Sequence, residues 1–348
     1  MNRILWSSDS GKTDNQDTHD TPWLSDSPES DNHDTNRGTM NQRQRRTWLI
    51  RYLLEEHPDY QSNAAIPAIP RDENEQRLLL RALLNVRPPT PISTRFLHIQ
   101  DEYLQAELEH HTIIDANAIP PMATADADES LDGTATGNPT NGIGTPANAN
   151  TTANATGNKS HTTTLAVWQG DITTLRCDVI VNAANSGLTG CYAPNHRCID
   201  NAIHSAAGVQ LRLACAELMD RQRRPEPVGQ AKITPAFNLP SQYVLHTVGP
   251  MIPSGNPTAE EQAQLADCYR ACLRLAAANR LESIAFCCIS TGEFRFPAEL
   301  AARIAVRTMR EFLRTGGNGS ISPISIRKVI FDVFSDRDRQ LYERTLAE

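Results

Sequence analysis

Short apolar runs alternate with longer segments of helical spacing from Thr163 to the end of the chain. The runs 165–168 and 178–181 are typical of buried strands, and 199–218 has the apolar spacing of a helix. Strands and helices in this order form mostly parallel sheets that helices cover on both faces. The sequence therefore predicts an α/β fold with a mixed, mostly parallel sheet. Ligands of such folds bind at the carboxyl ends of the strands.

The alternation continues to the C-terminus. We expect further strands at 231–234, 243–246, 283–289 and 327–334, helices at 260–278 and 297–313, and a short last helix.

Residues 1–162 differ from this region in composition and in apolar periodicity. Residues 1–42 are rich in Asp, Ser, Asn and Thr and have no apolar periodicity, which predicts disorder. Residues 43–115 contain three helical stripes, the third opened by Ser93 or Thr94 as a cap, and form a small helical module. Residues 116–162 are mostly Ala, Thr, Asn and Gly and predict a flexible insertion or linker.

The net charge and the cysteine content argue against some classes of function. The net charge of −8 argues against nucleic acid as a partner, whereas backbone N–H groups can still bind a small anion. All eight cysteines lie at or after Cys177, which favours reduced thiols or metal ligands over a disulfide scaffold. No apolar run is long enough to cross a membrane, and the N-terminus lacks the apolar core of a signal peptide. We therefore expect a soluble intracellular, cytoplasmic protein with no membrane partner.

The strongest local signal is Cys191, His196 and Cys198, which lie close together in sequence. Two thiolates and an imidazole suit Zn²⁺, and three ligands without a clear fourth match the open geometry of a catalytic zinc site. One alternative is a closed metal site in which a remote thiol is the fourth ligand. The other is that no metal binds, and that two buried cysteines merely lie near a surface histidine. The remote candidates are Cys215, Cys287 and Cys288.

Polar turns follow two of the predicted strands. Gly170 permits a turn, and Asp171 can accept a hydrogen bond from an amino group such as that of adenine. Asn182 and Asn185 follow the next strand and could hold a diol such as ribose. Taken alone, each could equally be an ordinary turn or a helix cap.

A third turn, Ser290 to Phe294, joins a strand to a helix that opens with Pro297. Successive N–H groups at a helix N-terminus can cradle a phosphate, and Phe294 or Phe296 could stack beside a ribose. An ordinary strand-to-helix connection is the alternative.

Taken together, these segments resemble the macrodomain family, whose members have an ADP-ribose-binding three-layer α/β/α fold. The resemblance covers about residues 165–340. It is carried by Gly170-Asp171-Ile172-Thr173, Asn182-Ala183-Ala184-Asn185, the segment Asp200 to Gly208, His246-Thr247-Val248-Gly249-Pro250 and Ser290-Thr291-Gly292.

Two features resemble a zinc-dependent subclass of protein-ADP-ribose hydrolases. The run from Gly190 to Cys198 stands where many macrodomains have a Gly-rich run, and residues 83–105 resemble the helical extension that precedes these proteins. The resemblance implies a fold of 163–348 and one zinc ion held by Cys191, His196 and Cys198. Arg295 departs from the family, because other macrodomains use Gly there.

The resemblance also implies the roles of the loops. Gly170, Asp171 and Ile172 would hold adenine, and Ser290, Thr291, Gly292, Glu293 and Phe294 would surround the diphosphate. Asn182, Ala183, Asn185 and Asp200 would lie near the distal ribose, with Asn185 and Asp200 as the catalytic candidates.

The expected activity is removal of mono-ADP-ribose from a modified protein side chain, with free ADP-ribose as the product ligand. The alternatives are a non-catalytic ADP-ribose reader and a hydrolase of small metabolites such as O-acetyl-ADP-ribose.

Overall fold

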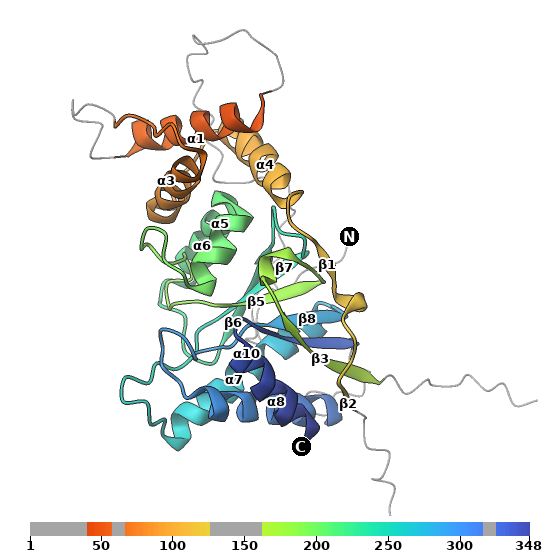
Figure 1. The fold of residues 1–348 in the computed structure, drawn as a ribbon. Helices are drawn as coiled ribbons and strands as arrows, with labels where there is room; N and C mark the ends of the chain where they lie inside the picture. The colour runs from red at the N-terminus through yellow and green to blue at the C-terminus, as the bar shows by residue number, and fades with distance from the viewer. Residues whose placement is uncertain (1–39, 58–66, 126–161, 316–324) are drawn as a thin grey trace, which may run out of the picture.

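The computed structural model describes residues 40–57, 67–125, 162–315 and 325–348 (Figure 1). Most of the predicted disordered segment 1–42 and of the predicted linker 116–162 lies outside these ranges. Within the described residues, none of the helices combines the length and apolar character that a membrane span requires.

A seven-stranded mixed sheet with the order β2-β3-β9-β8-β5-β7-β6 forms the centre of the fold. The five inner strands are mutually parallel, and the edge strands β2 and β6 are antiparallel to their neighbours. This arrangement confirms the predicted mostly parallel sheet. From one edge to the other, the strands are β2 (Ala123–Ala125), β3 (Thr163–Gln169), β9 (Lys328–Val333), β8 (Ser283–Phe286), β5 (Val179–Ala183), β7 (Tyr243–Thr247) and β6 (Ala231–Pro235).

Helices cover both faces of this sheet, as Figure 1 shows. Helices α5 (Ile199–Ala207) and α6 (Val209–Gln222) lie on one side. Helices α7 (Ala259–Ala278), α8 (Ala298–Arg314) and α10 (Asp336–Ala347) lie on the other. The predicted α/β/α architecture is therefore confirmed, because strands such as β5 and β9 are buried on both faces.

The single helix predicted over 199–218 is wrong in one respect, because the structure breaks it into α5 and α6 at Gly208. Gly208 has a φ of +91°, a conformation that side chains disfavour. A Cβ at this position would lie 2.5 Å from the Nε2 of Gln100. The break therefore lets the N-terminal region approach the backbone between the two helices.

The predicted linker also begins too early. Residues 114–115 form β1 (Ile114–Asp115), which pairs with β4 (Leu175–Arg176), and β2 extends the main sheet beside β3. Buried Ala116 and Ile119 join the core of the sheet domain. We call residues 114–125 the strap. Its structure could not be predicted from the Ala-rich sequence, because small buried residues give no clear periodicity.

In the described part of the chain, three helices precede the sheet domain and form their own hydrophobic cluster. They are α1 (Gln42–Glu56), α3 (Glu73–Val86) and α4 (Thr94–Leu108), and we call them the helical extension. Ser93, one of the two predicted caps, accepts from the backbone N–H of Phe96. The cluster includes Val209 and Leu213 of α6, so the extension packs directly on the sheet domain.

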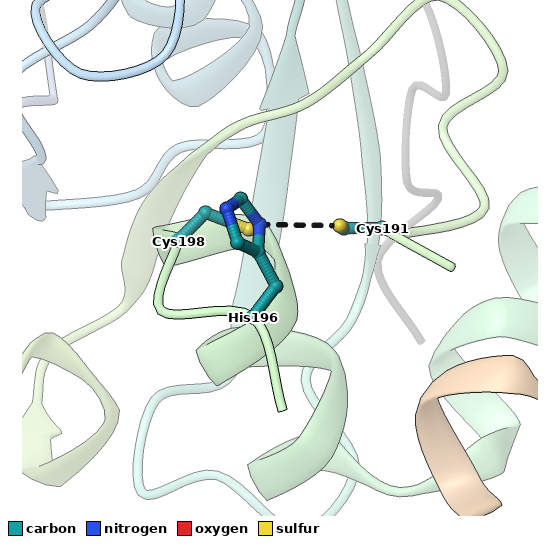
Figure 2. Close-up of side chains that lie close together, drawn as sticks. All are labelled: Cys191, His196 and Cys198. Atoms are coloured by element: carbon teal, nitrogen blue, oxygen red, sulfur yellow. Dashed lines mark hydrogen bonds between the residues drawn. The ribbon is translucent and has the colours of Figure 1, made fainter. Parts of the chain in front are cut away.

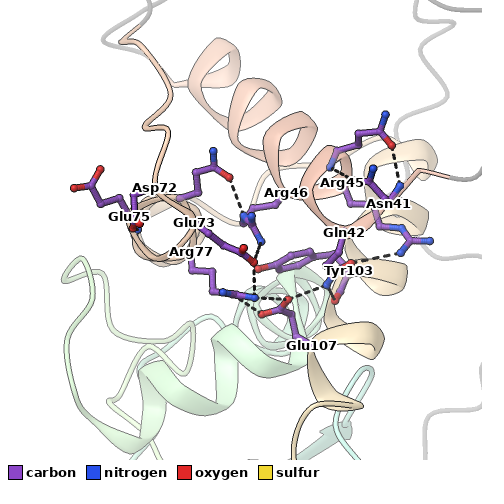
Figure 3. A network of polar contacts seen from close by, with 12 residues as sticks. Asn41, Gln42, Arg45, Arg46, Asp72, Glu73, Glu75, Arg77, Tyr103 and Glu107 are labelled. Atoms are coloured by element: carbon purple, nitrogen blue, oxygen red, sulfur yellow. Dashed lines mark hydrogen bonds and ion pairs between the residues drawn. The ribbon is translucent and has the colours of Figure 1, made fainter.

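A polar network ties the three helices of the extension together (Figure 3). Arg46 is only 1% exposed, and its Nε donates to the Oε1 of Gln76 over 3.0 Å. Its NH1 donates to Glu73 over 3.1 Å, and Arg77 pairs with both Glu73 and Glu107. The buried guanidinium is thus satisfied by partners on α3, which fixes α1 against that helix.

The core of the extension gives a stability prediction. Phe96 is fully buried, and its ring centroid lies 4.9 Å from that of Tyr52. Phe96→Ala is expected to lower the free energy of unfolding of the extension by about 3–5 kcal/mol, since it leaves a cavity. Denaturant unfolding measures this loss. Exposed Leu78→Ala is the control and should change stability by less than about 0.5 kcal/mol; equal losses in both variants would refute the assignment of this core.

Candidate functional site

The loops that carry the predicted site residues leave the carboxyl ends of three parallel strands. Gly170 follows β3, Asn182 lies near the end of β5, and Ser290 follows β8. These strands are parallel through the intervening β9, so the three loops emerge at the same edge of the sheet. In open α/β sheets this is the edge where ligands bind.

The turn after β3 has the polar group that the sequence predicted. A Cβ on Gly170 would lie 2.3 Å from the Trp168 ring, so a larger residue there would displace this ring. The Oδ1 of Asp171 accepts from the backbone N–H and the hydroxyl of Thr173, and these bonds leave the second carboxylate oxygen available. The side chain of Ile172 is only 1% exposed and belongs to the core. Only the backbone of Ile172 can therefore face a ligand.

At the end of β5, Asn182 belongs to a buried polar network. Its Nδ2 donates to the Oδ1 of Asp200 over 2.8 Å and lies 3.2 Å from the Nδ1 of His246. Burial raises the pKa of Asp200 to about 6, although the hydrogen bond from Asn182 acts in the opposite direction. The Oδ1 of Asn182 is buried without a partner among the described residues. Asn182 and Asp200 are therefore brought together, just beneath the surface.

Asn185 has a different setting from Asn182. Its Oδ1 accepts from the N–H of Gly187 over 2.9 Å, and its Nδ2 donates to the carbonyl of Gly190 over 3.0 Å. The Asn185 amide therefore stabilises the turn that leads to Cys191. This is the local capping role that the sequence also allowed for Asn185. Its predicted catalytic role stays a prediction.

The loop after β8 has an unusual backbone path. Ser290 and Arg295 have φ angles of 66° and 56°, so both take the left-handed conformation that Gly adopts most readily. Gly249 makes room for the loop, because a Cβ there would lie 2.0 Å from the Oγ of Ser290. Phe296 is buried in the core and Phe294 is half-buried, so only Phe294 can stack on a ligand.

The same loop presents unpaired donors. Among hydrogen bonds within the described residues, the backbone N–H groups of Gly292, Glu293 and Phe294 have no acceptor. They lie just before the N-terminus of α8, which favours negative charge. Successive free N–H groups in this position can bind a phosphate, and we call Ser290–Phe294 the anion cradle.

Cys191, His196 and Cys198 converge between Gly190 and the start of α5 (Figure 2). Their donor atoms all lie within 4.8 Å of one another, with 3.4 Å between the Sγ of Cys191 and the Nδ1 of His196. All three side chains are half-buried. Two sulfurs and one imidazole in this arrangement fit Zn²⁺.

Without a bound ion, the surroundings of Cys198 favour the neutral thiol. Burial raises the pKa of Cys198 to about 11, and the nearby sulfur of Cys191 acts in the same direction. The N–H of Asn201 donates to the Cys198 sulfur over 3.4 Å and opposes the shift. Without a cation, two neighbouring thiolates repel each other, whereas metal ligation requires deprotonated sulfur.

The residues considered as a fourth ligand lie apart from these three side chains. In the described part of the chain, no further Cys, His, Asp or Glu donor lies within 4.8 Å of all three. Cys215 belongs to a separate cluster, Cys287 is fully buried, and Cys288 contacts the carbonyl of Asp332. The donor set is therefore open.

The second cluster joins His204, Cys215 and His246 in the core. Arg212 is close enough to affect the pKa of both His204 and Cys215, and this guanidinium opposes another cation. The Nε2 of His246 lies 2.9 Å from the hydroxyl of Thr234, and burial lowers the pKa of His246 to about 3. His204, Cys215 and His246 are therefore neutral in the folded protein.

The loop from Cys191 to Cys198, which we call the metal loop after its predicted role, contacts the anion cradle through His196. The Nε2 of His196 lies 3.4 Å from the Oε1 of Glu293, while its Nδ1 faces Cys191. A carboxylate on the far nitrogen orients a metal-binding imidazole and fixes its tautomer. Glu293, predicted to lie near the diphosphate, is therefore also placed to hold His196.

Two residues near the site were missed in the sequence. Arg212 is buried beneath the loop, with its guanidinium 4.5 Å from the Tyr192 ring, and it donates to the carbonyl of Arg87. Asn85 of α3 contacts the same loop at Asn195. Their partners are distant in sequence, so no local pattern could have indicated them.

This chain is similar to known proteins over most of its length. The macro domain family profile matches residues 181–305. A protein-ADP-ribose hydrolase of Treponema medium is 47% identical over 308 residues, 88% of this chain and 100% of the relative. A protein of the same name from Staphylococcus aureus is 39% identical, over 85% of this chain and 94% of its own length. Both matches are longer than segment 163–348 and therefore reach beyond it.

Among solved structures, the Oceanobacillus iheyensis macrodomain with ADP is 37% identical, with a TM-score of 0.47, over 53% of this chain and 90% of that one.

The buried network at the site predicts a pH dependence of stability. His246 is neutral in the folded protein and gains a proton on unfolding below about pH 6.5, so acid destabilises the fold. Its contribution to the free energy of unfolding should fall by about 2 kcal/mol between about pH 7.5 and about pH 5. Chemical unfolding measures the slope, to which buried His204 adds with the same sign, whereas Asp200, whose pKa is raised by burial, contributes with the opposite sign. His246→Gln should flatten the slope; an unchanged slope would contradict this account.

Proposed function

The chain belongs to the macro domain family, and on that premise we propose that it is a zinc-dependent hydrolase that removes mono-ADP-ribose from modified protein side chains. The observation that carries the proposal is the convergence of Cys191, His196 and Cys198 beside the anion cradle. The names of the Treponema medium and Staphylococcus aureus relatives support a protein-ADP-ribose hydrolase activity.

The loops at the sheet edge would bind the nucleotide in order. The free carboxylate oxygen of Asp171 would accept from the adenine amino group, with the backbone of Gly170 and Ile172 close by. The free N–H groups of the cradle would donate to the diphosphate, and Phe294 would stack beside a ribose. The distal ribose would then lie near the metal loop, because His196 contacts Glu293 of the cradle.

Cys191, His196 and Cys198 would hold the ion, and their open donor set leaves room for another ligand. When bound, Zn²⁺ supplies a Lewis acid that can orient a ribose hydroxyl or lower the pKa of a water. The chain's own groups would position the reacting atoms. Asn182 fixes the carboxylate of Asp200, and Asn185 shapes the loop before Cys191.

Two other functions remain to be separated from this one by experiment. A non-catalytic reader would bind ADP-ribosylated protein without releasing ADP-ribose, and the complete set of three metal donors argues against it. A metabolite hydrolase would prefer O-acetyl-ADP-ribose to a modified protein. Turnover measured side by side on a mono-ADP-ribosylated protein and on O-acetyl-ADP-ribose distinguishes all three functions.

The zinc assignment gives the first functional prediction. Cys191→Ala and His196→Ala should each lose bound zinc and reduce the rate of ADP-ribose release by at least about 100-fold, since each removes a ligand. Elemental analysis and an assay on mono-ADP-ribosylated protein measure the two effects. His110→Ala, which removes an exposed imidazole from the helical extension, is the matched control and should keep both. A metal-free variant with wild-type turnover would exclude the role of zinc.

Adenine recognition gives the second functional prediction. Asp171→Ala should weaken ADP-ribose binding about ten-fold, because it removes a charge-assisted hydrogen bond worth about 1.5 kcal/mol. Calorimetric titration measures the change. An analogue with hypoxanthine in place of adenine lacks the amino group, so the wild type should bind it more weakly and Asp171→Ala should no longer discriminate. Equal discrimination by both proteins would place adenine elsewhere.

A further inference from the structure

The helical extension reaches the metal loop through one buried side chain. Asn85, near the end of α3, is only 1% exposed. Its Oδ1 accepts from the backbone N–H of Asn195 over 3.0 Å, and its Nδ2 donates to the hydroxyl of Ser205 on α5 over 3.0 Å. Both ends of this amide are therefore used to join the extension to the sheet domain.

The hydrogen bonds continue from Ser205 back to the metal loop. The Ser205 hydroxyl donates to the Oδ1 of Asn201 over 3.2 Å. Asn201 in turn donates its Nδ2 to the carbonyl of Ala193 over 3.0 Å and its backbone N–H to the sulfur of Cys198. One connected set of hydrogen bonds therefore holds the loop between Cys191 and Cys198, from Asn85 of the helical extension and from Asn201 of α5.

This loop needs such support because it has no helix or strand of its own. Between Cys191 and Cys198, one backbone hydrogen bond within the loop is formed, from the N–H of His196 to the carbonyl of Ala193. Asn195 also has a φ of +55°, which a non-glycine residue adopts at a cost. Ordering each residue of a free loop costs about 1–2 kcal/mol in conformational entropy. A contact from outside the loop at Asn195 restricts the loop before an ion binds. Ion binding then has to offset a smaller loss of conformational entropy.

We propose that Asn85 is a positioning residue for the metal centre, so that the helical extension is a working part of the site. It fixes Asn195, and through Asn195 the adjacent His196, opposite Cys191. The inference deepens the proposed function and rests on it for the identity of the ion. Arg81 of the same helix adds a longer contact, 3.5 Å from its NH2 to the carbonyl of His196.

The extension also contacts the sheet domain away from the metal loop, which supplies a matched control. Gln105 of α4 donates its Nε2 to the carbonyl of Asn238 over 2.9 Å. If the extension only docks on the sheet domain, loss of Asn85 and loss of Gln105 should have similar consequences. If Asn85 positions the ligands, only its loss should affect the loop.

The experiment compares the full-length wild type with Asn85→Ala, Ser205→Ala and Gln105→Ala. Zinc affinity is measured by competition with a chelator. Amide hydrogen exchange across residues 191–198 is measured on the metal-free proteins, and thermal unfolding verifies that each variant is folded. Asn85→Ala is expected to bind zinc about ten-fold more weakly and to exchange the Asn195 amide about ten-fold faster. Gln105→Ala should stay within about two-fold of wild type in both.

The outcomes separate this inference from the proposed function. If the wild type binds zinc and Asn85→Ala matches Gln105→Ala in affinity and exchange, the inference is wrong and the metal centre stands. If the wild type binds no zinc, the proposed function fails, and exchange of the metal-free loop still decides the role of Asn85. Should Asn85→Ala not fold, Ser205→Ala, which breaks the same set of hydrogen bonds, decides in its place.

Discussion

The site depends on holding two sulfurs and an imidazole together on a loop that has no regular secondary structure. Cys198 is anchored because its sulfur caps helix α5, whereas Cys191 and His196 depend on contacts from elsewhere. Asn185 shapes the loop before Cys191, and Asn85 holds it after the turn. Because free chain loses entropy on ordering, these outside contacts decide whether the three donors meet.

The parallel sheet explains why this loop lies at the edge where ligands of open α/β sheets bind. Parallel strands send their following loops to the same edge, so the loop after β5 and the loop after β8 become neighbours although α5, α6, β6, β7 and α7 lie between them in the sequence. The contact between His196 and Glu293 joins them. An anion bound at the cradle and an ion bound at the cysteines would therefore affect each other, since each would lie close to the same carboxylate.

Much of the fold could be predicted because apolar periodicity specifies strands and helices locally. The predictions went wrong where a distant partner decides the structure: Gly208 breaks a helix to admit Gln100, and an Ala-rich segment becomes the strap that contains β2. That Cys191, His196 and Cys198 lie close together was predictable from their spacing. The burial of the Ile172 side chain was not predictable, because the sequence of a turn does not show which of its side chains point into the core. Asn85 was invisible for the same reason as Gln100, since its partners belong to another module.

X-ray absorption at the zinc edge of the purified, metal-loaded protein tests the central claim most directly, because it counts the atoms around the ion. The account predicts two sulfurs at about 2.3 Å and nitrogen or oxygen ligands at about 2.0–2.1 Å, with one of the latter sensitive to added ADP-ribose. A shell of four sulfurs, or one without sulfur, would contradict the assignment of Cys191, His196 and Cys198 as the open metal centre.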